Sequence, residues 1–213
     1  MLRRRMVADC FLCRPDQRLI FAETPGCLAM CGIGPIVPGY SLVATKAHIP
    51  SMADLDPTGR EALSAFLEQV NRLLAVEYGS AAVAEHGRVP ICDFLTENAD
   101  GHCYHAHLLL FPNAPPILAA ASQHTEYLGG AESLSSALEL AGTKEHYLLI
   151  ADRGTTGFGV LAPPEPPIRQ FARTLVAASI GRPELADWRK FPDPEIAFEY
   201  AAVLRARALA REA

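Results

Sequence analysis

The stretch from Gly101 to Pro112 is apolar apart from its histidines, which predicts an inner strand of a sheet, and His105 and His107 lie two residues apart in it. Side chains alternate between the two faces of a strand, so both imidazoles and Leu109 would point to one face. Two imidazoles held side by side can share a phosphate, or one can bind a metal while the other does chemistry. A core strand whose histidines are merely satisfied by hydrogen bonds is the alternative, since His-x-His alone is a weak motif.

The charge and composition of the chain exclude one class of partner. The 213 residues are 50% hydrophobic and 20% charged, and the formal net charge is -5. This length allows one substantial core, or one core plus an appendage. An acidic chain lacks the basic face that a nucleic-acid binder needs, whereas local dipoles can still hold a small phosphorylated ligand.

The sequence contains no apolar run of the roughly 18 to 20 residues that span a bilayer. The basic start from Met1 to Arg5 is followed by no long apolar segment, so no secretory signal is expected. We therefore expect a cytoplasmic protein with no membrane partner, in which the six cysteines stay reduced and either bind a metal or are simply buried.

Cys10 and Cys13 form a Cys-x-x-Cys pair, and no second such pair follows. The pair alone could be a redox couple, half of a zinc site or two buried small residues. A zinc site would need two more ligands. His48 would become a third ligand only if the fold brings it to the two cysteines.

Turn and capping signals divide the first half of the chain into three strands, a long helix and two strands. Asp56 and Pro57 predict the start of the helix, an apolar stripe at helical spacing follows, and Gly79 ends it. This order predicts an antiparallel α+β meander and not alternating βαβ units. The expected strands are residues 18–23, 26–31, 40–45, 81–85 and the histidine-bearing run.

The composition changes after Pro112, and we place a domain boundary between residues 115 and 116. Residues 116–213 are expected to form an extension that packs on the same core. This part predicts a helix at 131–141, a hairpin of strands 147–151 and 157–161, a helix at 168–180 and a last helix after Asp193. The sequence shows no internal repeat.

With these features in place, the chain resembles the histidine-triad (HIT) superfamily of nucleotide hydrolases and nucleotidyl transferases. The hallmark of that superfamily is His-φ-His-φ-His-φ-φ, where φ is apolar, often followed by proline, and residues 105–112 read H-A-H-L-L-L-F-P. The Cys-x-x-Cys, the segment P-G-Y-S-L-V-A-T-K-A-H-I and the E-H-G strand end agree with it, and R-Q-F-A-R-T-L-V-A looks like the C-terminal extension of some bacterial members. The resemblance implies an α+β fold with a HIT-like antiparallel sheet of about five strands, a long helix packed on it and a C-terminal helical extension.

The resemblance also implies a structural zinc ion. In zinc-containing relatives, including galactose-1-phosphate uridylyltransferases, the metal is held by the Cys-x-x-Cys, the histidine of a Lys-x-His segment and the first triad histidine. The matching residues are Cys10, Cys13, His48 and His105. Two cysteines and two histidines complete a tetrahedral site with no open position, so the zinc would be structural.

The same resemblance makes the middle histidine, His107, the nucleophile. Its neutral imidazole would attack the α-phosphorus of a nucleotide, and water or another acceptor would then release the nucleotidyl-histidine. Backbone N–H groups near Gly101 and Cys103 would meet the phosphate oxygens, and His102 would protonate the leaving group or be a solvated loop residue. The implied enzyme is a hydrolase or nucleotidyltransferase that acts on a nucleoside phosphoanhydride or phosphoramidate.

Two departures from the family pattern favour an alternative function. Leu109 stands where the third triad histidine is found, which removes a hydrogen-bond donor, although uridylyltransferase-like relatives carry glutamine there. Gly32, beside the expected substrate-binding residue Ile33, falls where many members have an aspartate that binds the ribose hydroxyls. The alternative is a catalytically impaired protein that binds a nucleotide or metabolite. A third hypothesis is a zinc domain that serves as an interaction module.

Glu85 and His86 form the E-H-G strand end, which lies near the active-site wall in relatives. Both are expected to contribute to substrate binding, with Glu85 orienting His107 or His86. A turn with a solvated ion pair is the alternative. Homodimers are common in the family, and the exposed face of the long helix could form one.

Overall fold

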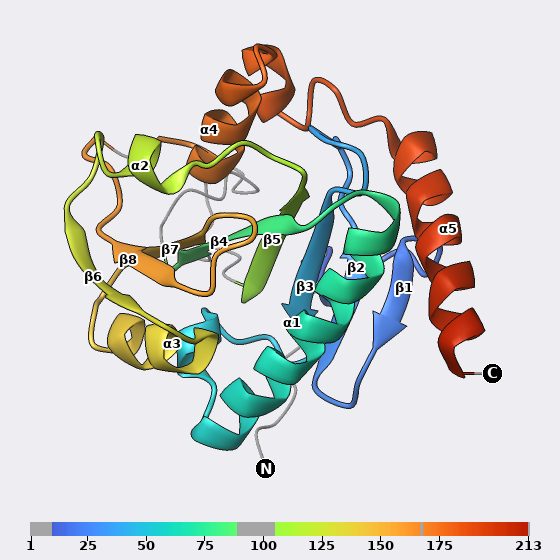
Figure 1. Ribbon diagram of the computed structural model, residues 1–213, viewed down its shortest axis with the longest axis horizontal. Coiled ribbons are helices and arrows are strands. Elements are labelled where there is room, and N and C mark those ends of the chain that lie inside the picture. The colour runs from blue at the N-terminus through green and yellow to red at the C-terminus, as the bar shows by residue number, and fades with distance from the viewer. Residues whose placement is uncertain (1–9, 89–104, 167, 213) are drawn as a thin grey trace.

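The computed structural model describes residues 10–88, 105–166 and 168–212, and its strands form one antiparallel sheet (Figure 1). Eight strands are found in these ranges, in the order β1-β2-β3-β5-β4-β7-β8-β6. The expected α+β class is confirmed, and the first 115 residues supply five of the strands. The strands are β1 (Ile20–Glu23), β2 (Cys27–Cys31), β3 (Ser41–Thr45), β4 (Ala81–Gly87), β5 (His107–Pro112), β6 (Tyr127–Ala131), β7 (Tyr147–Ala151) and β8 (Phe158–Leu161).

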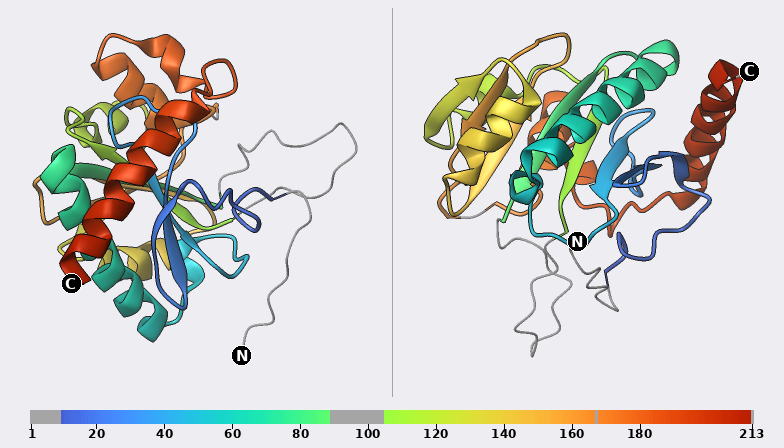
Figure 2. Two further views of the ribbon diagram at one scale, coloured as in Figure 1. Left: turned by 90° about the vertical axis from the view of Figure 1, so that its right-hand side faces the viewer. Right: turned by 90° about the horizontal axis from the view of Figure 1, so that it is seen from below.

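Helices cover both faces of the sheet and one of its edges. Helices α1 and α3 contact each other and lie on the same side of the sheet, α4 lies against the other face, and α5 packs beside the edge strand β1 (Figures 1 and 2). None of the helices in the described part of the chain combines the length and apolar character needed to cross a bilayer. The helices are η1 (Met52–Asp54), α1 (Pro57–Glu77), α2 (Leu118–Ala121), α3 (Leu134–Gly142), α4 (Phe171–Ser179), η2 (Pro183–Ala186) and α5 (Pro194–Glu212).

Helix α1 follows the capping signals that predicted it. The Asp56 carboxylate accepts a hydrogen bond from the backbone N–H of Gly59 at 2.7 Å, with proline at the first helical position. Gly79 follows the helix with a positive φ of 92°, which glycine adopts without strain. The apolar stripe of the helix is buried against the sheet, as expected for core, through Leu63, Phe66, Leu67, Val70, Leu73 and Leu74.

The C-terminal half repeats the chain path of the N-terminal half. The element order β3-α1-β4-β5 is followed by β6-α3-β7-β8. In each set the strand that follows the helix (β4 or β7) lies nearest the middle of the sheet, the last strand (β5 or β8) lies next to it, and the first strand (β3 or β6) lies furthest from the middle. The two sets meet where β4 pairs antiparallel with β7. The sheet therefore continues across the expected boundary between residues 115 and 116, and the division into two domains stays a prediction.

Several C-terminal elements were not predicted, namely β6, α2 and η2. Strand β6 contains Gly129 and Gly130 and has no fully buried side chain, so it lacks the alternating apolar pattern of a half-buried strand. The predicted hairpin is confirmed, because β7 and β8 pair antiparallel across the turn after Ala151. The predicted helix at 131–141 begins later, at Leu134, because Ala131 ends β6 and the side chain of Ser133 caps the helix by accepting from the N–H of Ser136.

Candidate functional site

Four side chains from three distant parts of the chain meet at the start of β5. They are the two cysteines of the N-terminal loop, His48 beyond β3 and His105 before β5, and their ligand atoms all lie within 4.8 Å of one another. The Sγ of Cys10 is 3.3 Å from Nδ1 of His105, and the Sγ of Cys13 is 3.1 Å from Nδ1 of His48 and 3.6 Å from Nδ1 of His105. This group could hold a metal ion.

The hydrogen bond of His105 fixes which nitrogen faces the cysteines. Its Nε2 lies 2.7 Å from the carbonyl oxygen of Thr45, which can only accept, so Nε2 carries the proton. The lone pair is then on Nδ1, toward both sulfur atoms. Burial lowers the pKa of His105 to about 4, so the ring is in the neutral form that binds metal.

The donor set fits zinc. A tetrahedral Zn²⁺ with bond lengths of roughly 2.0 to 2.3 Å holds its sulfur and nitrogen ligands about 3.5 Å apart, and the three S···N distances run from 3.1 to 3.6 Å. Burial also lowers the pKa of His48, which keeps this second imidazole neutral. With four protein ligands the site would have no open position, as a structural zinc site requires.

His107 is the first residue of β5 and is half-buried. Its Nδ1 lies 2.7 Å from the carbonyl oxygen of His105, so Nδ1 donates and Nε2 keeps a lone pair. Burial lowers the pKa of His107, while this hydrogen bond opposes the shift. No hydrogen bond joins Nε2 to any described residue, so a neutral imidazole presents an unprotonated nitrogen.

Leu109 lies on the same face of β5 as His107, as the strand period predicts. Its side chain is 5% exposed and is flanked by Leu42 of β3 and Ala84 of β4. Leu109 therefore joins the apolar core, and its side chain offers no hydrogen bond.

Glu85 and His86 are neighbours on β4, so they point to opposite faces of the sheet. The buried Glu85 carboxylate accepts hydrogen bonds from the N–H of Met52 and the hydroxyl of Tyr147, both at 2.7 Å. Burial raises the pKa of Glu85 to about 7. The expected contact of Glu85 with His107 or His86 is not formed, because the carboxylate lies on the η1 side of the sheet.

His86 lies on the face that carries His107. The pairing of β4 with β5 ends at Ala84 and Leu109, and the same register continued by two residues places His86 opposite His107, which is close enough to act electrostatically on His86. Its Nε2 accepts a hydrogen bond from the backbone N–H of Ala172 in α4 at 3.2 Å. Burial, together with the nearby His107, lowers the pKa of His86 to about 4.

Three of the remaining expected site residues, Gly101, His102 and Cys103, lie outside the described residues. Ile33 is half-buried in the segment between β2 and β3 and packs against the core. At Gly32 a Cβ would lie 2.2 Å from the ring of Tyr40, so an acidic side chain does not fit there without displacing the ring.

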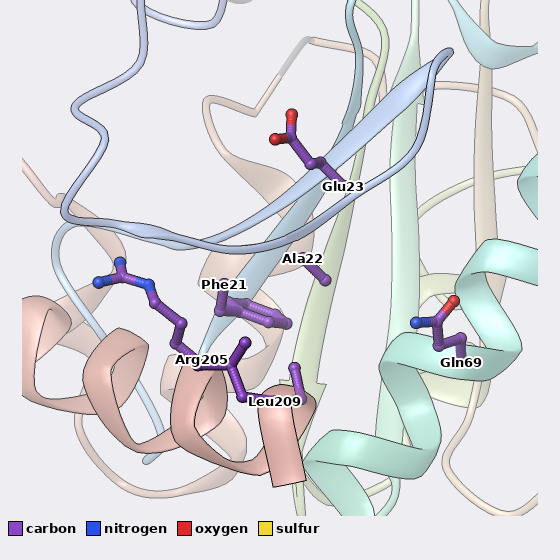
Figure 3. A pocket seen from close by; sticks show the side chains of 7 residues that line it. Phe21, Ala22, Glu23, Gln69, Arg205 and Leu209 are labelled. Carbon is purple, nitrogen blue, oxygen red and sulfur yellow. The ribbon is translucent and has the colours of Figure 1, made fainter. Parts of the chain in front are cut away.

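Tyr147, Ala172 and Arg173 support the site from the C-terminal half and were not predicted from the sequence as site residues. A backbone N–H such as that of Ala172 has no residue signature, and Tyr147 resembles any core aromatic. The segment around Arg173 was noted only because it looks like a family extension. Among the described residues a separate hollow lies between β1, α1 and α5 (Figure 3), and its lining contains none of the expected site residues: Phe21, Ala22, Glu23, Gln69, Arg205, Ala208 and Leu209.

A scan against protein families matches residues 15–89 to the HIT domain. No curated protein matches the sequence. Among solved structures, a GalT-like protein from Arabidopsis thaliana is 12% identical over 93% of this chain and 92% of its own, with a TM-score of 0.45. An ADP-glucose phosphorylase from Arabidopsis thaliana is 11% identical over 94% of this chain and 90% of its own, with a TM-score of 0.44. A hypothetical histidine triad nucleotide-binding protein from Sulfolobus tokodaii is 16% identical over 48% of this chain and 68% of its own, with a TM-score of 0.37. The stretch that includes β1 to β4 and α1 is thus similar to a HIT domain.

Proposed function

We propose that this protein is a nucleotidyl hydrolase or nucleotidyltransferase that acts on a nucleoside phosphoanhydride or phosphoramidate through His107. The observation that carries the proposal is the state of this side chain. Its Nδ1 is engaged by the carbonyl of His105, and its Nε2 is unprotonated and without a hydrogen bond to any described residue. The HIT-domain match over residues 15–89 supports the same reaction class.

The reaction would proceed in two displacements. Nε2 of His107 forms a bond to the α-phosphorus, and the bond from phosphorus to the leaving group breaks. The leaving group keeps the electron pair of that bond and takes a proton from an acid that we expect to be His102. Water or another acceptor then attacks the phosphorus, loses a proton and returns the electron pair to Nε2. During the first step positive charge develops on the imidazole, and the 2.7 Å hydrogen bond from Nδ1 to the carbonyl of His105 stabilises it.

Cys10, Cys13, His48 and His105 would hold a structural zinc ion. When bound, the metal would supply cross-linking of the N-terminal loop to β3 and β5, and no reaction chemistry. The residues themselves connect the two sites, because His105 offers Nδ1 to the cysteines and its carbonyl oxygen to His107. A fixed position of Cys10 and Cys13 would therefore also help to fix the position of His107, the proposed nucleophile.

A second candidate function is a nucleotide- or metabolite-binding protein that has lost catalysis. Leu109 favours it, because this buried side chain supplies no donor to a phosphate oxygen. Loss of one charge-stabilising donor typically lowers a rate by roughly 10² to 10³. Such a protein would bind the same ligands and would form no covalent adduct.

The test is a search for the covalent intermediate. The protein is incubated with diadenosine polyphosphates, nucleoside phosphoramidates and nucleotide sugars, quenched in base because phosphohistidine is acid-labile, and measured by intact mass. The wild type should gain the mass of one nucleotidyl group, and His107→Ala should gain none. His146→Ala is the matched control, since His146 is exposed and hydrogen-bonds only to a backbone carbonyl.

Three results would count against the proposed enzyme. An adduct that persists in His107→Ala would contradict the role of His107. Absence of any adduct and product with every compound, together with a raised melting temperature for some of them, would favour the binding protein. If no phosphorylated compound binds, the zinc-domain interaction module becomes the better interpretation.

A further inference from the structure

The residue opposite the nucleophile is a second histidine from the neighbouring strand. Directly opposed residues of an antiparallel pair have Cβ atoms about 4.5 to 5.5 Å apart and share one face. Continued two residues beyond the Ala84–Leu109 pair, the β4–β5 register places His86 beside His107, and burial together with the nearby His107 lowers the pKa of His86. On the other side of His107 the register places Ala44 of β3, which has no polar group in its side chain.

Helix α4 determines which nitrogen of His86 carries its proton. The backbone N–H of Ala172 can only donate, so Nε2 of His86 must be the unprotonated acceptor. A neutral ring in this arrangement carries its proton on Nδ1. Nδ1 has no hydrogen-bond partner among the described residues, so this N–H is available to a ligand.

The position of α4 is itself held by a buried cation. Arg173 is 4% exposed and donates from Nη2 to the carbonyls of Gly34 at 2.8 Å and Leu185 at 2.9 Å, and from Nε to that of Ala186 at 3.0 Å. Its guanidinium also lies over the ring of Tyr40, 4.9 Å from the centroid. These contacts tie the first turn of α4 to the segment between β2 and β3, which keeps the N–H of Ala172 on His86.

We propose that α4 holds His86 as a neutral donor whose Nδ1–H binds an anionic oxygen of the phosphoryl group that His107 attacks, in the role that Leu109 leaves empty. The inference rests on the proposed function and adds a positioning element from the C-terminal half. The donor comes from β4 and not from the third triad position of β5. Its orientation depends on a backbone group far away in the sequence.

The tautomer is tested first, by long-range ¹H–¹⁵N NMR of the full-length protein labelled on histidine. We expect the neutral Nδ1–H form of His86 at pH 7. In Ala172→Pro, which removes the N–H at a helical position that tolerates proline, the signal should move toward a mixture of the two tautomers. Ala172→Gly keeps the N–H and is the matched control. A wild-type ring with its proton on Nε2 would overturn the inference.

The donor role is tested by the single-turnover rate of adduct formation. His86→Leu should be slowed roughly 10²-fold, and His86→Asn, which keeps one acceptor and one donor, should lose less. In the double variant His86→Leu with Leu109→His, a donor returns from β5, and at least a tenfold recovery over His86→Leu is expected. His146→Leu should react like the wild type.

The two failures are distinguishable. A wild type that forms no adduct overturns the proposed function, and the tautomer measurement still decides how α4 holds His86. A wild type that reacts while His86→Leu keeps more than half of its rate overturns the donor role. Recovery of the rate in the double variant supports the inference that a donor on β4 can replace one on β5. A double variant as slow as His86→Leu contradicts that inference.

Discussion

The two halves of the sheet share a chain path and differ in chemistry. In the N-terminal half, β5 carries His107 and adjoins the Cys/His group, whereas β8, its counterpart in the C-terminal half, reads Phe-Gly-Val-Leu and carries no titratable side chain. The C-terminal half contributes indirectly, through the hydroxyl of Tyr147 on Glu85 and the N–H of Ala172 on His86. The same chain path can therefore carry the side chains of the candidate site in the N-terminal half and hold those side chains in place from the C-terminal half.

The largest expected difference is between substitutions in β5 and in β8. His107→Ala should lower the rate at least roughly 10³-fold, because the proposed nucleophile is removed, while the melting temperature changes little. Val160→Ala in β8 leaves a cavity in the core and should destabilise the protein by about 2 kcal/mol with the rate retained. Kinetics and thermal unfolding of both variants check this contrast, and a large rate loss in Val160→Ala would break it.

Loss of a ligand from the Cys/His group (Cys10, Cys13, His48 and His105) should give the next largest effect, a decrease in stability. Cys13→Ser or a strong chelator should remove the bound metal and lower the free energy of unfolding by several kcal/mol, since binding energy of a structural zinc is folding energy. Cys27→Ser is the matched control, because Cys27 is buried on β2 and lies outside the group. Elemental analysis should find one zinc per chain in the wild type and control. Full zinc content in Cys13→Ser would exclude this assignment.

Glu85 predicts a stability that falls as the pH rises. Burial raises its pKa to about 7 in the folded protein from an ordinary value of 4.5, so between these values the folded state keeps a proton that the unfolded state releases. The wild type should lose about 3 kcal/mol of unfolding free energy over this range. Glu85→Gln should abolish the Glu85 part of this slope in urea titrations at pH 4.5 to 7.5, and an unchanged slope would show that other groups cause it.

The smallest effect concerns the hydroxyl that the C-terminal half supplies to Glu85. Tyr147→Phe removes the O–H that donates to the carboxylate and the oxygen that the N–H of Ala53 approaches at 3.3 Å. The expected cost is about 1 to 2 kcal/mol, as for a buried hydrogen bond to a polar group. Chemical denaturation measures it, with Tyr127→Phe as the exposed control. Equal stability of the two variants would mean that β7 supports the site by apolar packing alone.

Local signals were enough to predict the features that depend on neighbouring residues. Helix α1 has a capping aspartate, an apolar stripe and a closing glycine, and the β7–β8 hairpin has two apolar runs around a turn, so each element is encoded within its own residues. The proposed zinc ligands were named from their resemblance to a family pattern, and the structure brings the same four side chains together.

Tertiary structure alone decided how the strands and the two halves are placed. Glu85 was expected to orient His107 or His86, but adjacent residues on a strand face opposite ways, and the register of β4 against β5 brings only His86 to the side of His107. The repeat of the C-terminal half is also absent from the sequence, because a chain path needs only apolar patterning and many residue combinations provide it. The tautomer of His86 depends on the N–H of Ala172, 86 positions away, and hydrogen bonds of that kind exist only once the chain has packed.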